Sequence, residues 1–333
     1  MKKHFQMEQS KTRLAVLLAT CNGESYIGMQ LDSLFHQTCQ DFTLYIHDDG
    51  STDGTLAVIE TYRQQYPERL CVLEYEPQGN ARDNFLSLLQ RVQAEYYMFC
   101  DQDDCWLAEK VQISLESIQD LQGEQSHIPC LVFSDLTVTD SQLHALHFSY
   151  LEYKHKNPKD LSLKALLREN VAPGCTILCN QALAEYGLKY EDSAHLFMHD
   201  WWLMLVAAAF GRIAWISKSL VLYRQHGNNA VGAGKGGISW LGKKAKNILE
   251  GRQIASSKEG ITMQRTMAAE LSAILQQEVQ TKGSTPFCAP EERKLLQELS
   301  QITSKSKWQR ICFYRKHKLL KRDWKNKWKL LLV

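Results

Sequence analysis

The first 140 residues alternate between short apolar segments and segments with helical periodicity, and this alternation limits the folds open to the chain. Five apolar segments predict β-strands, at 13–20, 42–49, 70–76, 96–104 and 131–140. The stretches between them predict helices, at 24–37, 55–66, 84–94 and 106–121. We therefore expect an α/β fold in which a mostly parallel, Rossmann-like sheet carries helices on both faces.

The remainder of the chain has a less regular pattern. It predicts a strand at 175–180, an apolar helix at 199–210 and a strand or hairpin at 213–226. After a glycine-rich break at 232–237, further helices are expected near 256–280 and 289–303. We divide the chain into an N-terminal tail, an α/β domain, a helical C-terminal extension and a basic tail, with the bounds 1–12, 13–235, 236–304 and 305–333.

Composition and charge exclude several classes of protein. A net charge of only +2 argues against a general nucleic-acid binder. The ten cysteines include no C-x-x-C pair and mostly lie in or beside apolar runs, which indicates free thiols in a reducing, cytosolic compartment. The N-terminus has no signal-peptide core, and the longest apolar runs are too short to cross a bilayer. We therefore expect the folded part of the chain to be soluble, on the cytoplasmic side.

Two acidic motifs end predicted strands, which is where sheets of this kind bind ligands. The first is DDGSTDG, at 48–54. A carboxylate in this motif can accept hydrogen bonds from a nucleobase or a ribose, and the glycines permit a tight turn with close backbone approach. The alternative is an acidic turn in which Ser51 or Asp53 caps the following helix.

The second acidic motif, DQDD at 101–104, indicates a metal site. Three carboxylates within four residues repel one another, and a bound cation removes that cost. Carboxylate oxygens suit Mg²⁺ or Mn²⁺ better than Zn²⁺, and these ions keep positions open for substrate phosphates. A metal that bridges a diphosphate stabilises the charge developing on the leaving group. The alternative is a solvated acidic loop.

Two later segments add candidate residues. Asp200, in the segment HDWW, is a candidate general base for an acceptor hydroxyl or, alternatively, a helix N-cap. The adjacent Trp201 and Trp202 would form a sugar-stacking wall on the acceptor side, or would belong to the core. His226, in the segment YRQHGNN, would complete the metal site or contact the diphosphate, although a single histidine is more often structural.

The order and spacing of these motifs resemble those of the inverting family-two glycosyltransferases of the GT-A fold. The matching segments are LLATCNGESYIGMQLDSLFHQT, IHDDGSTDGT, FCDQDDCW, and HDWW followed by YRQHGNN. The resemblance covers about residues 13–230. Within the family, the last two motifs are most similar to bacterial rhamnosyltransferases of cell-wall, capsule or O-antigen assembly.

The resemblance implies roles for individual residues on the donor side. Thr20 would lie against the nucleotide, and Asp49, with Asp48 as the second choice, would contact the base. Asp101 would line the donor sugar and the ribose. Arg82 would neutralise phosphate or support the base pocket, although its segment, QGNARDN, departs from the commonest pattern of the family.

The resemblance also implies the chemistry. Asp103 would be the principal metal ligand, and His226 a second ligand of the metal or the diphosphate. Asp200 would remove the proton of the acceptor hydroxyl while the nucleoside diphosphate leaves from the opposite face, which inverts the anomeric carbon. The expected reaction is a metal-dependent transfer of a sugar, with rhamnose from dTDP-rhamnose as the first candidate, to a lipid-linked cell-surface glycan.

Two alternative functions also fit the sequence. The same class of enzyme could use UDP-glucose, UDP-galactose or a UDP-N-acetylhexosamine as its donor. A noncatalytic nucleotide- or polyanion-binding protein belongs to another class, and metal-dependent turnover of a nucleotide sugar separates it from the enzyme. A dehydrogenase is disfavoured because no G-x-G-x-x-G follows the first predicted strand.

The last segment of the chain is strongly basic. Between residues 305 and 329 it carries eleven lysines and arginines against a single aspartate. Leu320, Trp324 and Trp328 recur every four residues and would share one face of a helix. Such a helix suits an anionic membrane surface, so we expect peripheral attachment to the inner face of the plasma membrane. A solvated helix packed on the rest of the protein, or a tail that binds nucleic acid nonspecifically, is the alternative.

Overall fold

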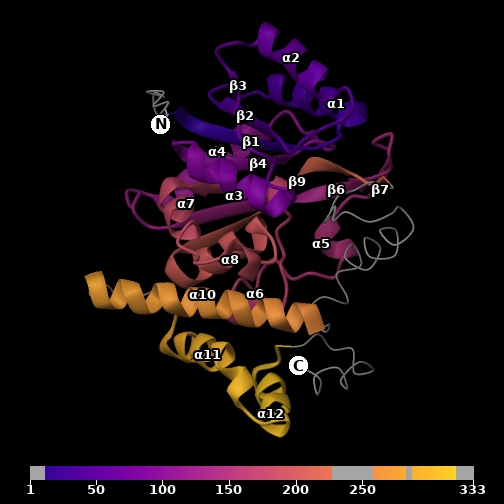
Figure 1. The fold of residues 1–333 in the computed structure, drawn as a ribbon. Helices are drawn as coiled ribbons and strands as arrows, with labels where there is room; N and C mark the ends of the chain where they lie inside the picture. The colour runs from indigo at the N-terminus through magenta and orange to yellow at the C-terminus, as the bar shows by residue number, and fades with distance from the viewer. Residues whose placement is uncertain (1–11, 227–257, 283–286, 320–333) are drawn as a thin grey trace.

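The computed structural model describes residues 12–226, 258–282 and 287–319 (Figure 1). Its strands are β1 (Thr12–Thr20), β2 (Thr43–Asp48), β3 (Leu70–Val72), β4 (Ala94–Asp101), β5 (Cys105–Trp106), β6 (Cys130–Thr139), β7 (Ala145–His147), β8 (Ile177–Asn180) and β9 (Arg212–Arg224). They form one sheet in the order β3-β2-β1-β4-β8-β6-β9-β5, and β7 pairs with β6 outside this path.

The sheet is parallel where the β–α alternation predicts it. The pairs β2–β3, β1–β2 and β1–β4 are parallel, as is β6–β9 farther along the sheet. The short strand β8 lies antiparallel between β4 and β6, and β5 and β7 are also antiparallel to their neighbours. The expected α/β fold with a parallel central sheet is confirmed.

Helices cover both faces of the sheet (Figure 1). They are α1 (Glu24–Phe35), α2 (Thr55–Gln65), α3 (Ala81–Arg91), α4 (Lys110–Gln122), α5 (Tyr150–Tyr153), α6 (Leu163–Arg168), α7 (Gln181–Gly187), α8 (His199–Phe210), α10 (Lys258–Lys282), α11 (Pro290–Ser300) and α12 (Lys307–His317).

Strand β1 divides the interior into two hydrophobic cores. Its residues 14–18 are all fully buried, as is typical of a parallel strand covered on both faces. Because side chains alternate along a strand, Leu14, Val16 and Leu18 enter the core beneath α1 and α4. Ala15 and Leu17 enter the other core, which includes α3, α6 and α8.

The C-terminal extension is helical, as expected, and packs on the second core. Figure 1 shows α10 running across the base of the domain below α8, with α11 and α12 beyond it. Phe313 and Tyr314 of α12 are buried, whereas Trp308 is 73% exposed. The stripe of Leu320, Trp324 and Trp328 expected in the basic tail lies outside the described residues. Within the described part of the chain, no helix has the length and apolarity needed to cross a membrane.

Several element boundaries differ from those predicted. The third strand ends at Val72, and the fourth ends at Asp101, so that Asp103 and Asp104 lie in a loop. Helix α3 begins at Ala81 because the Asn80 side chain accepts a hydrogen bond from the Asp83 amide, a standard N-cap.

Pairing between distant strands decides two further elements. The helix expected from residue 106 begins at Lys110, since Trp106 belongs to β5 and pairs with Val221 of β9. Of the two alternatives predicted for 213–226, the strand is confirmed, and β9 runs beside β6 from Arg212 to Arg224. All ten cysteines are free, as the sequence indicated.

Gly211, where α8 gives way to β9, provides a test of the packing. A Cβ atom built at this residue would lie 1.8 Å from the carbonyl oxygen of Pro129, which is backbone and cannot rotate away. We predict that Gly211→Ala lowers the free energy of unfolding by about 3 kcal/mol, measured by urea denaturation.

Gly28, in the middle of α1, is the matched control. A Cβ there would meet nothing closer than Val58 at 3.9 Å. Gly28→Ala should therefore raise stability by up to about 1 kcal/mol, because alanine favours the helix more than glycine does. Equal effects of the two substitutions would contradict the packing described for Gly211.

Candidate active site

The carboxyl ends of β1, β2 and β4 meet at one edge of the sheet. Thr20 pairs with Asp48 across β1 and β2, and Ala19 pairs with Asp101 across β1 and β4. The Asp49 amide donates to the Thr20 carbonyl at 2.8 Å. The two acidic motifs are therefore neighbours in space, because parallel strands end on the same side.

The loop after β1 and the loop after β2 are joined by reciprocal hydrogen bonds. The Asn22 amide donates to Ser51 Oγ at 2.7 Å, and Asn22 Oδ1 accepts from the Thr52 amide at 2.8 Å. The Glu24 side chain accepts from the Gly54 amide at 2.9 Å, and the Gly23 amide donates to Thr55 Oγ1 at 2.8 Å. Each loop thus fixes the conformation of the other.

The two aspartates after β2 make different contacts. Both oxygens of Asp48 are engaged within its own turn, by the amides of Gly50 and Ser51 and by the Ser51 hydroxyl. Asp49 accepts through Oδ1 from the amides of Gln78 and Gly79, and no described residue donates to its Oδ2. Asp49 therefore has an oxygen available to a ligand, whereas Asp48 holds the turn.

Gln102 connects β1 to the acidic loop. Its Oε1 accepts from the Thr20 hydroxyl at 2.5 Å and from the Cys21 amide at 2.9 Å, and its Nε2 donates to the Cys21 carbonyl at 3.1 Å. A Cβ at Gly23 would lie 2.4 Å from the same Oε1. Thr20 is buried, and its hydroxyl is committed to Gln102.

Arg82 lies near this edge but is engaged with the protein. Its guanidinium binds the Asp83 carboxylate through two hydrogen bonds of 3.0 and 2.9 Å. A third hydrogen bond, of 2.8 Å, goes to the Leu196 carbonyl, in the segment before α8. Arg82 thus links the start of α3 to that segment.

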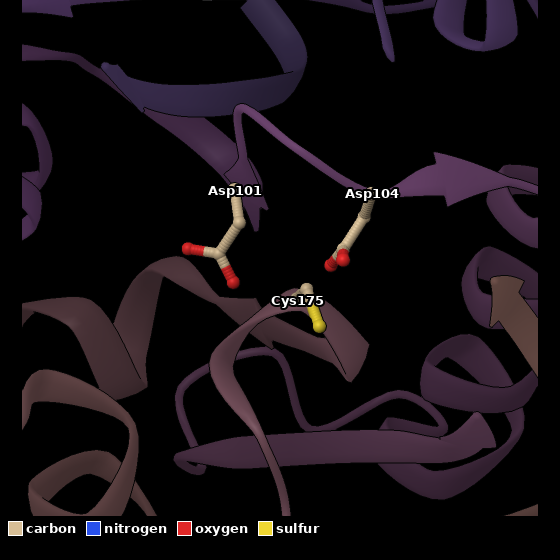
Figure 2. A group of neighbouring side chains, drawn as sticks. All are labelled: Asp101, Asp104 and Cys175. Atoms are coloured by element: carbon tan, nitrogen blue, oxygen red, sulfur yellow. The ribbon is translucent and has the colours of Figure 1, made fainter. Parts of the chain in front are cut away.

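The acidic loop gathers three side chains at the end of β4. Figure 2 shows the carboxylates of Asp101 and Asp104 directed toward the Cys175 thiol. The ligand atoms of these three residues all lie within 4.8 Å of one another. Burial, together with the nearby charges of Asp103 and Asp200, raises the pKa of Asp101 to about 7.

Asp104 is the most deeply placed of these carboxylates. It is fully buried, which raises its pKa well above the usual value, and Asp103 and Asp101 add to the effect. Its Oδ1 accepts from the Arg224 amide at 3.2 Å, while its Oδ2 is buried without a hydrogen-bond partner. An orphaned buried carboxylate oxygen is costly unless a cation or a proton satisfies it.

The loop also brings together the two predicted metal ligands. Asp103 Oδ2 and His226 Nε2 are 2.8 Å apart, and the His226 ring stacks on Tyr26 with a centroid distance of 4.4 Å. Arg224, which is buried, holds the loop by donating to the Asp103 carbonyl at 2.8 Å.

The end of β4 offers two groups of possible ligands for a divalent cation. Asp101 and Asp104 lie with Cys175, their ligand atoms within 4.8 Å of one another, and Asp103 and His226 form a separate pair. Carboxylate oxygens and an imidazole nitrogen suit Mg²⁺ or Mn²⁺. Burial raises the pKa of the Cys175 thiol, so the sulfur stays protonated and is a poor ligand. The unpartnered Oδ2 of Asp104 would be satisfied by a bound cation, or by the proton that its raised pKa favours.

Asp200 lies in the first turn of α8, close enough to Asp101 for its charge to raise the pKa of that residue. Its Oδ1 accepts from the Trp201 amide at 2.6 Å. Burial raises the pKa of Asp200 to about 6, and hydrogen bonds from Trp201, Asn170 and Gly174 partly oppose the effect. A carboxylate with such a pKa is well suited to act as a general base.

The tryptophans after Asp200 do not form a sugar-stacking wall. Both side chains are buried, and each indole donates to a backbone carbonyl, Trp201 to Leu166 at 2.6 Å and Trp202 to Gly187 at 2.7 Å. The expectation of an acceptor-side role is corrected to one in the core. The reason is that α8 is packed on all sides, and a buried indole needs a partner for its N–H.

Comparison with known proteins identifies the family. Residues 15–187 match the sequence profile of Glycosyl transferase family 2. The chain belongs to this family. The enzyme is 31% identical over 226 residues to dTDP-rhamnosyl transferase RfbG of Shigella flexneri, a region that covers 65% of this chain and 74% of the relative.

Other relatives are more distant. An uncharacterized glycosyltransferase of Rickettsia typhi is 24% identical over 191 residues, and the match spans 57% of each chain, which is less than two thirds of that relative. Among solved structures, TarS 1-349 of S. aureus in complex with UDP-GlcNAc has a TM-score of 0.54 at 16% identity and covers 92% of this chain and 79% of its own. This likeness supports the GT-A fold of the glycosyltransferase.

Sequence reasoning missed four residues of the site. Arg224 lies in a quoted motif, so its position next to His226 was a signal that could have been used. Gln102 and Asp104 lie inside the acidic motif, but neither of them was assigned a role of its own from the sequence. Lys110 is fully buried with its ammonium 4.0 Å from the Trp106 ring centroid, and burial lowers its pKa to about 8. Nothing in the local sequence indicated this burial.

Gln102 tests how the donor-side loop is held. We predict that Gln102→Ala lowers the free energy of unfolding by about 2 kcal/mol, because the Thr20 hydroxyl and the Cys21 amide lose their shared acceptor. Urea denaturation would measure the change. Gln112→Ala, at an exposed site on α4, is the matched control and should change stability by less than about 0.5 kcal/mol. An equal loss of unfolding free energy at both positions would mean that the Gln102 hydrogen bonds do not cause the destabilisation.

Proposed function

We propose that this glycosyltransferase moves a sugar from a nucleotide-sugar donor to a hydroxyl of a lipid-linked cell-surface glycan, with inversion and with a divalent metal. The observation that carries the proposal is the placement of Asp200 beside Asp101, so that a base and a group of carboxylates share one electrostatic environment. The carboxylates at the end of β4 could bind a metal-chelated diphosphate, and Asp200 could accept a proton.

We assign donor binding and metal binding to the following residues. Asp49 would contact the nucleobase through its available oxygen, and Asp101 would line the donor sugar. Asp103 and His226, with Asp104 as a further candidate, would hold Mg²⁺ or Mn²⁺. When bound, such an ion supplies Lewis-acid stabilisation of the diphosphate leaving group.

Asp200 would act on the acceptor. Its carboxylate would take the proton from the acceptor hydroxyl as that oxygen attacks the anomeric carbon from the face opposite the leaving diphosphate. The bond to the acceptor oxygen forms as the bond to the diphosphate breaks, so the configuration inverts. Thr20 and Arg82 would support the donor pocket through Gln102 and Asp83, rather than by direct contact.

The relative in Shigella favours dTDP-rhamnose as the donor, because its name specifies that substrate and its identity to this chain is 31%. The TarS complex contains UDP-GlcNAc, which keeps UDP-sugars among the alternatives. A noncatalytic binding protein is disfavoured because Asp103, His226 and Asp200 occur in an arrangement that suits transfer.

We also propose that the enzyme works at the cytoplasmic face of the plasma membrane, where a lipid-linked acceptor would be found. The support is the basic helix α12, which carries Arg310, Arg315 and Lys316 together with the exposed Trp308. Cations near an anionic surface attract it, and an exposed indole suits the interface. In this proposal the α/β domain, the helical extension and the basic tail keep the bounds given above.

A donor panel tests the proposed function. Release of nucleoside diphosphate would be measured with dTDP-rhamnose and with UDP-sugars, a polyprenyl-diphosphate-linked glycan as acceptor, and either Mn²⁺, Mg²⁺ or chelator. We expect turnover of dTDP-rhamnose that chelator abolishes, and a longer glycan product. Turnover of another donor alone would overturn the rhamnose assignment, and no turnover or binding of any donor would favour the noncatalytic alternative.

Substitution of the base is the second prediction for this reaction. Asp200→Asn should lower kcat for transfer by about 100-fold or more while leaving donor affinity nearly unchanged, because the amide cannot accept the proton. Asp192→Asn, at an exposed helix cap, is the matched control and should retain activity. Full turnover by Asp200→Asn would exclude the base role.

The pH profile follows from the same assignment. The base must be ionised, and burial raises its pKa to about 6, so kcat should fall as the pH is lowered through about 6. A profile of kcat at saturating donor and acceptor measures this. A rate that stays constant down to pH 5 would contradict the assignment.

A further inference from the structure

The helix α10 carries two buried carboxylates that apolar packing does not explain. Glu270 and Glu278 are each only 6% exposed. Met267, Ala268, Leu271 and Leu275 of the same helix already belong to the hydrophobic core. Burying a charged group costs free energy unless it is paired and hydrogen-bonded. The residues that bind these two carboxylates therefore indicate what the carboxylates stabilise.

Both carboxylates bind one short segment before α8, residues 186–195. Glu270 Oε1 is 2.6 Å from His195 Nδ1, and its Oε2 accepts from the Glu191 amide at 2.9 Å. Glu278 accepts from Lys189 Nζ at 2.6 Å and from the Tyr186 hydroxyl at 2.7 Å.

The contacts form a stripe along α10. Thr266, Glu270, Ile274 and Glu278 are spaced four residues apart and so lie along one side of the helix. Thr266 adds a hydrogen bond of 2.8 Å to the His195 carbonyl. A shift of α10 by one turn would leave both carboxylates without these partners, so the stripe fixes the register of the helix against residues 186–195.

The same segment is held from the donor side as well. Arg82 donates a hydrogen bond to the carbonyl of Leu196, which directly follows residues 186–195, the segment that α10 binds. Only three residues separate Leu196 from Asp200. A segment bound by Arg82 of α3 and by Glu270 of α10 therefore leads directly into the first turn of α8, which carries Asp200.

We propose that Glu270 and Glu278 are positioning residues for sugar transfer, which place Asp200 by fixing α10 against residues 186–195. This inference rests on the proposed function, because it assumes that Asp200 is the base. It assigns to the appended helix α10 a part in the reaction, although none of its residues touches the reacting groups.

The test compares Glu270→Gln with wild type in the full-length protein. Small displacements of a catalytic group have large effects on rate, so we expect kcat for transfer to fall about tenfold or more, with the KM for the donor unchanged. The acid limb of the kcat profile should also move, because Asp200 would shift relative to Lys156, Asn170, Gly174 and Asp101. A merely structural role would lower the melting temperature and leave that limb in place.

Glu298→Gln is the matched control. Glu298 lies in α11, in the same extension, and is also paired with a histidine, His317, at 3.9 Å. Within the described ranges of the chain, it forms no hydrogen bond or ion pair with residues 186–195. Its substitution should change neither kcat nor the pH profile.

A second variant keeps the inference testable if Glu270→Gln does not fold. His195 is 44% exposed at its side chain, so His195→Gln should leave the fold intact. We expect it to lower kcat as well, and the double variant should be no worse than the more impaired single variant, since both remove one interaction. Unchanged kcat per folded molecule in both single variants would overturn the inference.

Failure of the inference and failure of the proposed function give different results. If wild type consumes no donor, or if Asp200→Asn is fully active, the proposed function fails. If wild type is active and Asp200→Asn is not, while Glu270→Gln and His195→Gln match wild type in kcat and pH profile, only the positioning role is lost.

Discussion

Repulsion among carboxylates at the end of β4 is the constraint on which the rest of the site depends. Asp101, Asp103 and Asp104 lie within four residues, and Asp200 approaches from α8. Unopposed, these charges would push the end of the sheet apart. Hydrogen bonds from Arg224 and the linkage of Gln102 to β1 hold the loop in place.

The sequence predicted the part of this arrangement that depends on local pattern. The β–α alternation placed Asp48, Asp49 and Asp101 at strand ends, and parallel pairing brought those ends together as expected. Asp103 was predicted from the motif resemblance as a metal ligand, and His226 as a second ligand of the metal or the diphosphate. Their side chains lie 2.8 Å apart, and the ligand roles stay predictions. Boundaries were less well predicted, because β5 exists only through its pairing with β9.

What the sequence could not predict are contacts between residues far apart in the chain. Arg82 pairs with Asp83 and Leu196 instead of standing free for a phosphate, and nothing near Arg82 indicates a partner 114 residues away. The indoles of Trp201 and Trp202 are compatible with either a surface or a core role in the sequence. Only the packing of α6 and α7 around α8 decides for the core.

The interlocked loops after β1 and β2 have a consequence for how this family diverges. Asn22 and Glu24 satisfy amides of the second loop, while Ser51 and Thr55 satisfy amides of the first. A substitution in one loop leaves an unpaired group in the other unless a second change compensates for it. We therefore expect these positions to covary in an alignment of relatives, as two halves of one inherited unit.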